Sequence, residues 1–278
     1  MRVWSRVLGV LIGAVSTVLV AQSATALPIA PPTPEPVAGI PSPCVSKTPW
    51  PAEAGRERTR QLMQQRFNLT LTGEGWNRAE YRPIVKIIWE TLDGISCTPY
   101  LSQVLAQLDG KPLRIHAGST RSWAWGDWSL TNPGALTFDF SKFVQALDDK
   151  DPGRLVRLVV HELGHVRNMD RYSNPAYWNA FLNVQRNAGR FSDYGGSDPT
   201  EVLQEVIGYY VARCAKNNPY DKGHADYYDF AKTFIFNGVE FGPKPGQAVD
   251  CTMSSGEMKP PPGGSKLPNW LAPRSTHS

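Results

Sequence analysis

One pentapeptide, HELGH at residues 161–165, constrains the fold of this chain more than any other feature. It lies inside a nearly continuous apolar run, LVRLVVHELGHV at residues 155–166, and Asp151 followed by Pro152 is a typical helix start. On a helix, residues four positions apart project from one face, so both histidines of the pentapeptide can approach a single ion. The sequence therefore predicts a helix that presents two imidazoles side by side.

Two histidines and a glutamate arranged as HExxH on a helix are the signature of zinc metallopeptidases. Glu162 points to the side of the histidine pair, where it can take a proton from water. The alternative, two unrelated histidines on a surface helix, fits poorly because an unpaired carboxylate among apolar neighbours carries a desolvation cost. We therefore expect one catalytic Zn²⁺ ion bound by His161 and His165, with Glu162 as the general base.

A third zinc ligand is expected downstream, because catalytic zinc keeps three protein ligands. The metzincin pattern needs a glycine at position 168 and a histidine at 171, and the chain has Asn168 and Arg171 there. A second helix, predicted over residues 199–214, carries Glu201 and Glu205 on one face. Glu201 also stands at capping-box distance from the helix start, and Glu205 lies deeper among apolar residues. Spacing alone leaves the choice between the two glutamates open.

The segment YGGSDPTEVLQE at residues 194–205 resembles the catalytic segment of gluzincin metallopeptidases of the anthrax lethal factor type. In that family a Tyr-Gly pair, an Asn-x-x-Glu helix start and a second glutamate four residues later follow HExGH. The resemblance extends over residues 114–214. Val202-Leu203 replaces aromatic residues of the family and Gln204 replaces a small one, which weakens any transfer of substrate preference.

The resemblance implies a role for three residues of this segment. Glu201 completes the zinc site, and Tyr194 points its phenol at the oxyanion of the substrate. Glu205 holds a zinc ligand in its orientation.

The first 26 residues have the features of a secretory signal peptide. Arg2 and Arg6 precede an apolar run at residues 7–20, and residues 24–26 form an A-x-A cleavage site. Export would place the protein in an extracellular or periplasmic compartment, without stable membrane insertion after cleavage; an uncleaved anchor is the alternative. Without this segment 27 basic and 25 acidic residues remain, a balance that argues against nucleic acid as a partner.

Four cysteines in an exported chain favour two disulfides. The pairs Cys44 with Cys97 and Cys214 with Cys251 are favoured because each closes a local loop. In a sharper alternative, Cys44 is unpaired and caps the zinc as an inhibitory thiolate.

Composition divides the rest of the chain into three parts. Nine prolines at residues 27–52 predict an extended linker, and the Pro/Gly-rich residues 257–278 predict a flexible tail. Residues 53–256 are expected to form one zinc metallopeptidase domain.

The predicted fold class of this domain is α+β and zincin-like, with helical N-terminal and C-terminal parts and a small mixed sheet before the zinc helix. The expected helices, besides the zinc helix, cover residues 52–67, 76–92, 100–108, 175–184 and 199–214. The expected strands cover residues 113–116, 123–128 and 135–140, with a turn at 132–134.

Several aromatic and histidine residues have two interpretations each. Three tryptophans near the predicted strands are expected to pack under the sheet, with an aromatic wall for substrate as the alternative: Trp123, Trp125 and Trp128. His116 is interpreted as an ordinary strand residue, with zinc ligation as its alternative. His224 is interpreted as a loop residue, with assistance to the oxyanion as its alternative, and His277 belongs to the tail.

The predicted function is a secreted zinc-dependent endopeptidase that hydrolyses peptide bonds in a protein or peptide substrate by a zinc-activated water. An extended peptide can add as a strand to the edge of the predicted sheet. Two alternatives stay open: a zinc hydrolase of a non-protein amide, and a non-catalytic, toxin-like binding protein on the same fold.

Overall fold

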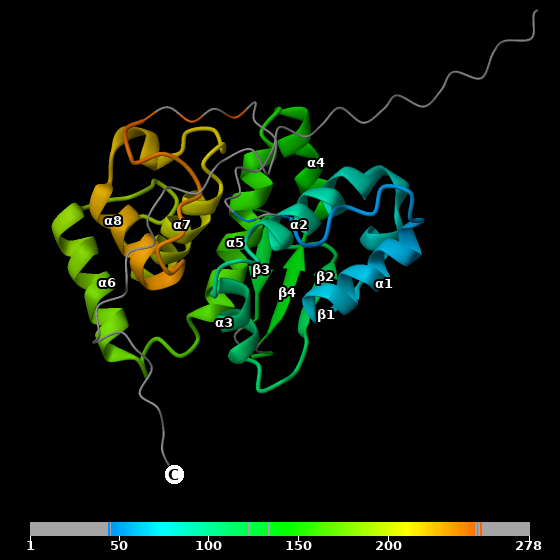
Figure 1. Ribbon diagram of the computed structural model, residues 1–278, viewed down its shortest axis with the longest axis horizontal. Helices are drawn as coiled ribbons and strands as arrows, with labels where there is room; N and C mark the ends of the chain where they lie inside the picture. Colours follow the sequence, from blue (N-terminus) through cyan, green and yellow to red (C-terminus); the bar gives the residue numbers. More distant parts are fainter. Residues whose placement is uncertain are drawn as a thin grey trace, which may run out of the picture. The chain divides into compact units, whose positions relative to one another are not determined.

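The computed structural model describes residues 44, 46–121, 123–129, 131–132, 134–247, 249 and 251. The predicted signal peptide, most of the proline-rich linker, and the predicted tail with His277 lie outside the described residues. Helices surround one small sheet (Figure 1), which confirms the α+β class. None of the helices in the described part of the chain combines the length and the apolar character that crossing a bilayer requires.

The part before the second strand is largely helical, as predicted. It comprises α1 (Arg56–Phe67), two 3₁₀ turns named η1 (Glu74–Asn77) and η2 (Ala79–Tyr81), α2 (Arg82–Gly94) and α3 (Tyr100–Ala106). The single helix predicted over residues 76–92 is therefore wrong at its start, where the two 3₁₀ turns stand. Pro83 explains the difference, because proline lacks the N–H that a helix interior requires and so occupies the first turn of α2.

The sheet has four strands in the order β1-β2-β4-β3. Their bounds are β1 (Leu69–Thr72), β2 (Leu113–Ala117), β3 (Gly126–Trp128) and β4 (Ala135–Phe138). β2 runs parallel to β1 and to β4, whereas β3 is antiparallel to β4, so the sheet is mixed, as predicted. β1 was not expected from the sequence, and β3 is shorter than the strand predicted at 123–128. β3 forms one edge of the sheet.

The C-terminal part is helical. After β4 come α4 (Phe140–Asp148), α5 (Pro152–Arg167), α6 (Pro175–Ala188), α7 (Pro199–Val211), the 3₁₀ turn η3 (Pro219–Lys222), α8 (Ala225–Phe230) and a π-helical turn, η4 (Ala231–Ile235). Three of these helices have proline at the first position, directly after a residue whose side chain caps the helix. Asp151, Asn174 and Asp198 accept a hydrogen bond from a backbone N–H in the first turn of α5, α6 and α7 respectively.

α5 lies between the sheet and α7 (Figure 1), and small residues allow the two helices to approach closely. A Cβ at Gly164 of α5 would overlap the side-chain oxygen of Gln204 on α7. A Cβ at Gly208 of α7 would lie 2.9 Å from the backbone oxygen of Arg157 on α5. Glycine at these two positions therefore lets the α5 backbone approach a side chain of α7 and the α7 backbone approach the backbone of α5.

Two disulfides join distant parts of the described chain. Cys44 is bonded to Cys97 and Cys214 to Cys251, which is the pairing that the local-loop argument favours. The alternative of Cys44 as an unpaired thiolate over the metal is wrong in this structure, because its sulfur is bonded to that of Cys97.

Candidate metal centre

α5 carries both histidines of the HELGH pentapeptide on one buried face. His161 and His165 are each 3% exposed, and their Nε2 atoms lie 3.2 Å apart. The four-residue spacing on the helix produces this juxtaposition. Two imidazole nitrogens of one helix therefore converge on a single point.

Glu201, in the first turn of α7, brings a carboxylate to the same point. Its Oε2 lies 3.2 Å from His161 Nε2, and its Oε1 lies 3.5 Å from His165 Nε2. Oε2 is buried and forms no hydrogen bond with good geometry within the described chain. The three ligand atoms lie within 4.8 Å of one another. Two neutral nitrogens and one carboxylate oxygen form the donor set of catalytic zinc sites, so these residues fit the ion.

The capping-box interpretation of Glu201 is not what the structure shows. In a capping box, the glutamate side chain accepts a hydrogen bond from the backbone N–H of the N-cap residue. Here that N–H, of Asp198, donates instead to the carbonyl of Gly195 at 3.2 Å. The Glu201 side chain is turned toward the histidines. Its place at the start of α7 therefore serves the cluster.

Glu205 approaches His161 from the opposite side of the ring. Its Oε1 lies 3.1 Å from His161 Nδ1 and accepts a hydrogen bond from Arg157 Nη1 at 2.5 Å, and its Oε2 accepts one from Ser192 Oγ at 3.2 Å. Burial opposes ionisation of this carboxyl, but the bond with His161 and the charge of Arg157 outweigh it and lower the pKa of Glu205. Glu205 can therefore hold the His161 ring so that Nε2 points at the cluster.

Glu162 lies beside the cluster and against the edge strand. A Cβ at Gly126 of β3 would lie 2.7 Å from Glu162 Oε1, so the strand can run this close only because position 126 is glycine. Burial raises the pKa of Glu162 to about 7; the charge of His161 acts in the opposite direction, and the charges of Glu201 and Asp127 add to the upward shift. A carboxyl with a pKa near neutrality is suited to both accepting and returning a proton.

The two histidines have opposite pKa shifts. Burial lowers the pKa of His161, but the adjacent carboxylates of Glu201 and Glu205 outweigh burial and raise the pKa to about 9. Burial, with the positive charges of His161 and Arg171, lowers the pKa of His165 to about 2. The carboxylates thus favour a positive charge at this point, and a divalent cation can take the place of the proton on His161.

Tyr194 belongs to the loop between α6 and α7 and lies at the rim of the cluster. Its ring centroid is 5.9 Å from that of His161, and the side chain is 58% exposed. Partial burial and the nearby carboxylates, Glu201 first among them, raise the pKa of Tyr194 to about 12. The phenol therefore keeps its proton at neutral pH and can donate a hydrogen bond.

The three tryptophans named from the sequence have three different environments. Trp128 stacks on His165, with ring centroids 4.9 Å apart and an interplanar angle of 6°. Trp125 packs against Phe143 and carries the guanidinium of Arg154 on its face. Trp123 is 64% exposed. Core packing thus describes Trp125, whereas Trp128 belongs to the cluster.

Two other histidines do not belong to the cluster. His116, in β2, pairs through Nδ1 with Thr72 Oγ1 at 3.1 Å. His224 precedes α8 and packs against Phe191 and Tyr227. Neither is a member of the group of ligand atoms that the described residues bring together.

Sequence reasoning missed four residues that contact the cluster or the glutamates beside it: Gly126, Trp128 as a partner of His165, Arg157 and Ser192. Arg157 had one usable signal, because it precedes His161 by four residues and so shares its helix face. The other three reach the cluster through tertiary structure.

Comparison with known proteins gives no relative for this arrangement: no protein-family model, no curated protein and no solved structure matches the chain.

Proposed function

We propose that this protein is a secreted zinc-dependent endopeptidase of the gluzincin type. The observation that supports the proposal best is the convergence of His161, His165 and Glu201, with a buried carboxylate, Glu162, next to them. A zinc ion held by the three ligands would lower the pKa of a water molecule toward about 7 and polarise the scissile carbonyl.

The residues around the metal centre have separate tasks in peptide hydrolysis. Glu162 takes a proton from the attacking water and returns it to the leaving amine. Tyr194, which keeps its phenolic proton, donates a hydrogen bond to the oxyanion of the substrate. Glu205 and the Trp128 ring hold the two imidazoles in place.

The edge strand β3 offers a binding surface for an extended peptide. It pairs only with β4, and no other described strand occupies its other edge, where we expect an extended peptide to add. Gly126 contacts Glu162, and Trp128 stacks on His165, so a peptide added along β3 passes both residues. This position supports a peptide substrate over a small non-protein amide.

Metal analysis combined with peptide profiling tests the proposal. The purified mature chain should contain about one zinc per molecule and cleave members of a proteome-derived peptide library. Glu162→Gln should keep the zinc and lower kcat by about 10²- to 10⁴-fold, because the proton acceptor is removed while the ligands remain. A zinc-loaded chain that cleaves no peptide would leave the non-catalytic and the non-protein alternatives. Equal turnover in Glu162→Gln would remove the base assignment.

A further inference from the structure

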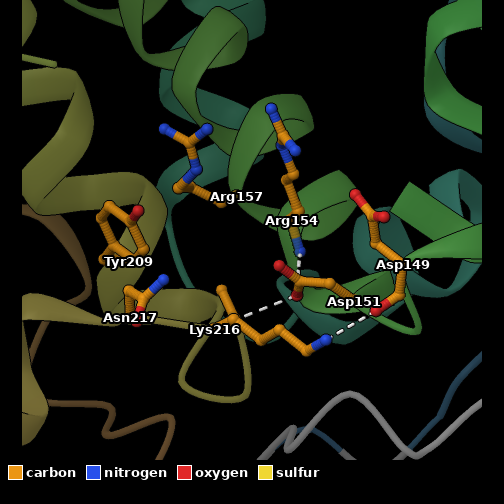
Figure 2. A pocket seen from close by; sticks show the side chains of 8 residues that line it. Asp149, Asp151, Arg154, Arg157, Tyr209, Lys216 and Asn217 are labelled. Atoms are coloured by element: carbon orange, nitrogen blue, oxygen red, sulfur yellow. Dashed lines mark hydrogen bonds between the residues drawn. The ribbon is translucent and has the colours of Figure 1, made fainter. Parts of the chain in front are cut away.

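A cavity of about 470 Å³ lies where α5 begins and α7 ends (Figure 2). Arg154 and Arg157 of α5, Tyr209 of α7 and Lys216 line it, together with Asp149 and Asp151. Figure 2 shows the two guanidinium groups extending from α5 in one direction, while Asp151 and Lys216 lie at the other end of the cavity.

The cavity and the metal centre lie along the same two helix faces. On α5, His161, Arg157 and Arg154 follow one another at spacings of four and three residues, and on α7, Glu205 and Tyr209 follow Glu201 at spacings of four. The ion pair of Arg157 with Glu205 lies between the two sites. Arg154 precedes His161 by seven positions, a rise of roughly 10 Å along the helix.

Most of the charges that line the cavity are already engaged. Arg157 is bonded to Glu205, and Lys216 Nζ donates to the backbone carbonyl of Asp149 at 2.6 Å. Asp151 Oδ1 accepts from the backbone N–H groups of Arg154 and Lys216 at 3.1 and 3.2 Å. Asp149 is exposed. The Arg154 guanidinium has no ion pair with any residue that the structure describes, so its charge is available to a ligand.

Trp125 holds the Arg154 guanidinium in a fixed position. The carbon of the guanidinium lies 3.7 Å from the centroid of the Trp125 ring, a cation–π contact. A guanidinium laid on an aromatic face keeps its N–H groups in the plane, where they match the two oxygens of a carboxylate. Trp125 directly precedes β3, so Arg154 stands at the end of the strand that passes Glu162.

We infer that Arg154 binds a carboxylate of the substrate about three residues from the scissile bond. The spacing follows from roughly 10 Å of helix divided by about 3.4 Å per residue of an extended peptide. This inference rests on the proposed peptidase function. The carboxylate is either the side chain of an acidic residue or the C-terminus of the peptide.

Matched peptides test the inference by their rates of cleavage. All peptides share one cleavage site. In each set, Glu, Gln or Lys stands two, three or four residues from that site, on one side or the other. In a further pair, the peptide chain ends at such a position, either as a free C-terminal carboxylate or as an amide. The wild type should cleave the carboxylate peptides with a kcat/KM higher by about tenfold or more. Arg154→Gln should lose this preference and Arg154→Glu should reverse it toward Lys. Arg186→Gln, which removes an exposed cation on α6, should retain it.

Peptide binding provides a second readout that needs no turnover. Fluorescence anisotropy with the Glu162→Gln variant should show the same preference for the carboxylate, and adding Arg154→Gln should remove it, with circular dichroism verifying the fold of each variant. Equal cleavage of the acidic and the amide peptides by the wild type would overturn the inference and leave the peptidase intact. If no peptide is cleaved, the proposed function fails. Anisotropy then tests the role of Arg154 without catalysis. Equal binding of the carboxylate and the amide peptides, or no binding of either, overturns the inference.

Discussion

At the scale of single residues, the cluster separates two glutamates that helical spacing alone leaves equivalent. Glu201 faces the Nε2 atoms of both histidines, whereas Glu205 faces Nδ1 of His161 and is bonded to Arg157 and Ser192. In the proposed metal site, one carboxylate would be a ligand, and the other would support the ligand His161 from the opposite side of its ring.

Substitution of the two glutamates should have unequal effects on metal affinity. Glu201→Ala removes a ligand, and the purified variant should contain little or no zinc. Glu205→Ala leaves all three ligands and should weaken zinc binding by about 10- to 100-fold, since only the orientation of His161 is lost. Zinc content after equilibration in chelator buffers of graded strength measures both. The reverse order would exchange the roles of the two residues.

Tyr194→Phe should lower kcat by about 10²-fold or more with zinc content unchanged, because the variant lacks the proton that the oxyanion accepts. Tyr172→Phe is a matched control: Tyr172 is also an exposed tyrosine, and the cluster does not include it. Steady-state kinetics on one peptide compares the two variants. An undiminished rate in Tyr194→Phe would reject the phenol as the donor.

At the scale of elements, α5 and α7 place the cluster, and small residues at their contact decide how closely they pack. Gly164 lies within the HELGH pentapeptide but faces Gln204 of α7. A position that looks like part of a chemical signature therefore also has a packing role.

Gly164→Ala should destabilise the protein by about 1–3 kcal/mol, because the added methyl group overlaps the Gln204 side chain in a filled interface. Chemical denaturation measures the change. Gly55→Ala is the control, since nothing lies within 4 Å of the added Cβ and the φ of Gly55 is −62°. Gln204→Ala in the same chain should recover part of the loss. A Gly164→Ala variant as stable as Gly55→Ala would contradict the packing role.

Some of the helices and strands could be predicted from the sequence, and others could not. Helices α5, α6 and α7 could be predicted because an Asp-Pro or Asn-Pro pair marks each start locally. β1 could not, since four residues acquire strand structure only by pairing with β2. α4 follows directly on β4, without a comparable start signal.

The contacts of the cluster likewise include some that could be predicted from the sequence and some that could not. Helical spacing suffices to place His161 beside His165, because both lie on one helix. Trp128 reaches His165, and Gly126 reaches Glu162, only through the position of the sheet beside α5. Such contacts join residues distant along the chain, and no local pattern encodes them.

At the scale of the whole molecule, the proposed ion links folding to metal supply. Its ligands come from α5 and α7, with α6 between them in the chain. An ion that binds only the folded state stabilises it by mass action.

Removal of zinc with a chelator should lower Tm, because stabilisation by a ligand at a thousand times its Kd amounts to about 4 kcal/mol. Differential scanning calorimetry with and without chelator measures the shift. The Glu201→Ala variant should show little response to chelator. An equal shift in that variant would mean that the ion acts at another place.

The glycine contacts between α5 and α7 also bear on which ion the proposed site would accept. Backbone atoms have no rotamers, so helices that touch through glycine have little freedom to move apart or together. Nitrogen and oxygen ligands bind Zn²⁺ at about 2.0–2.2 Å, whereas Ca²⁺ requires about 2.3–2.6 Å. If the three residues hold zinc, larger side chains at these positions would spread the donor atoms and fit that ion less well, so the two glycines would contribute to its selection.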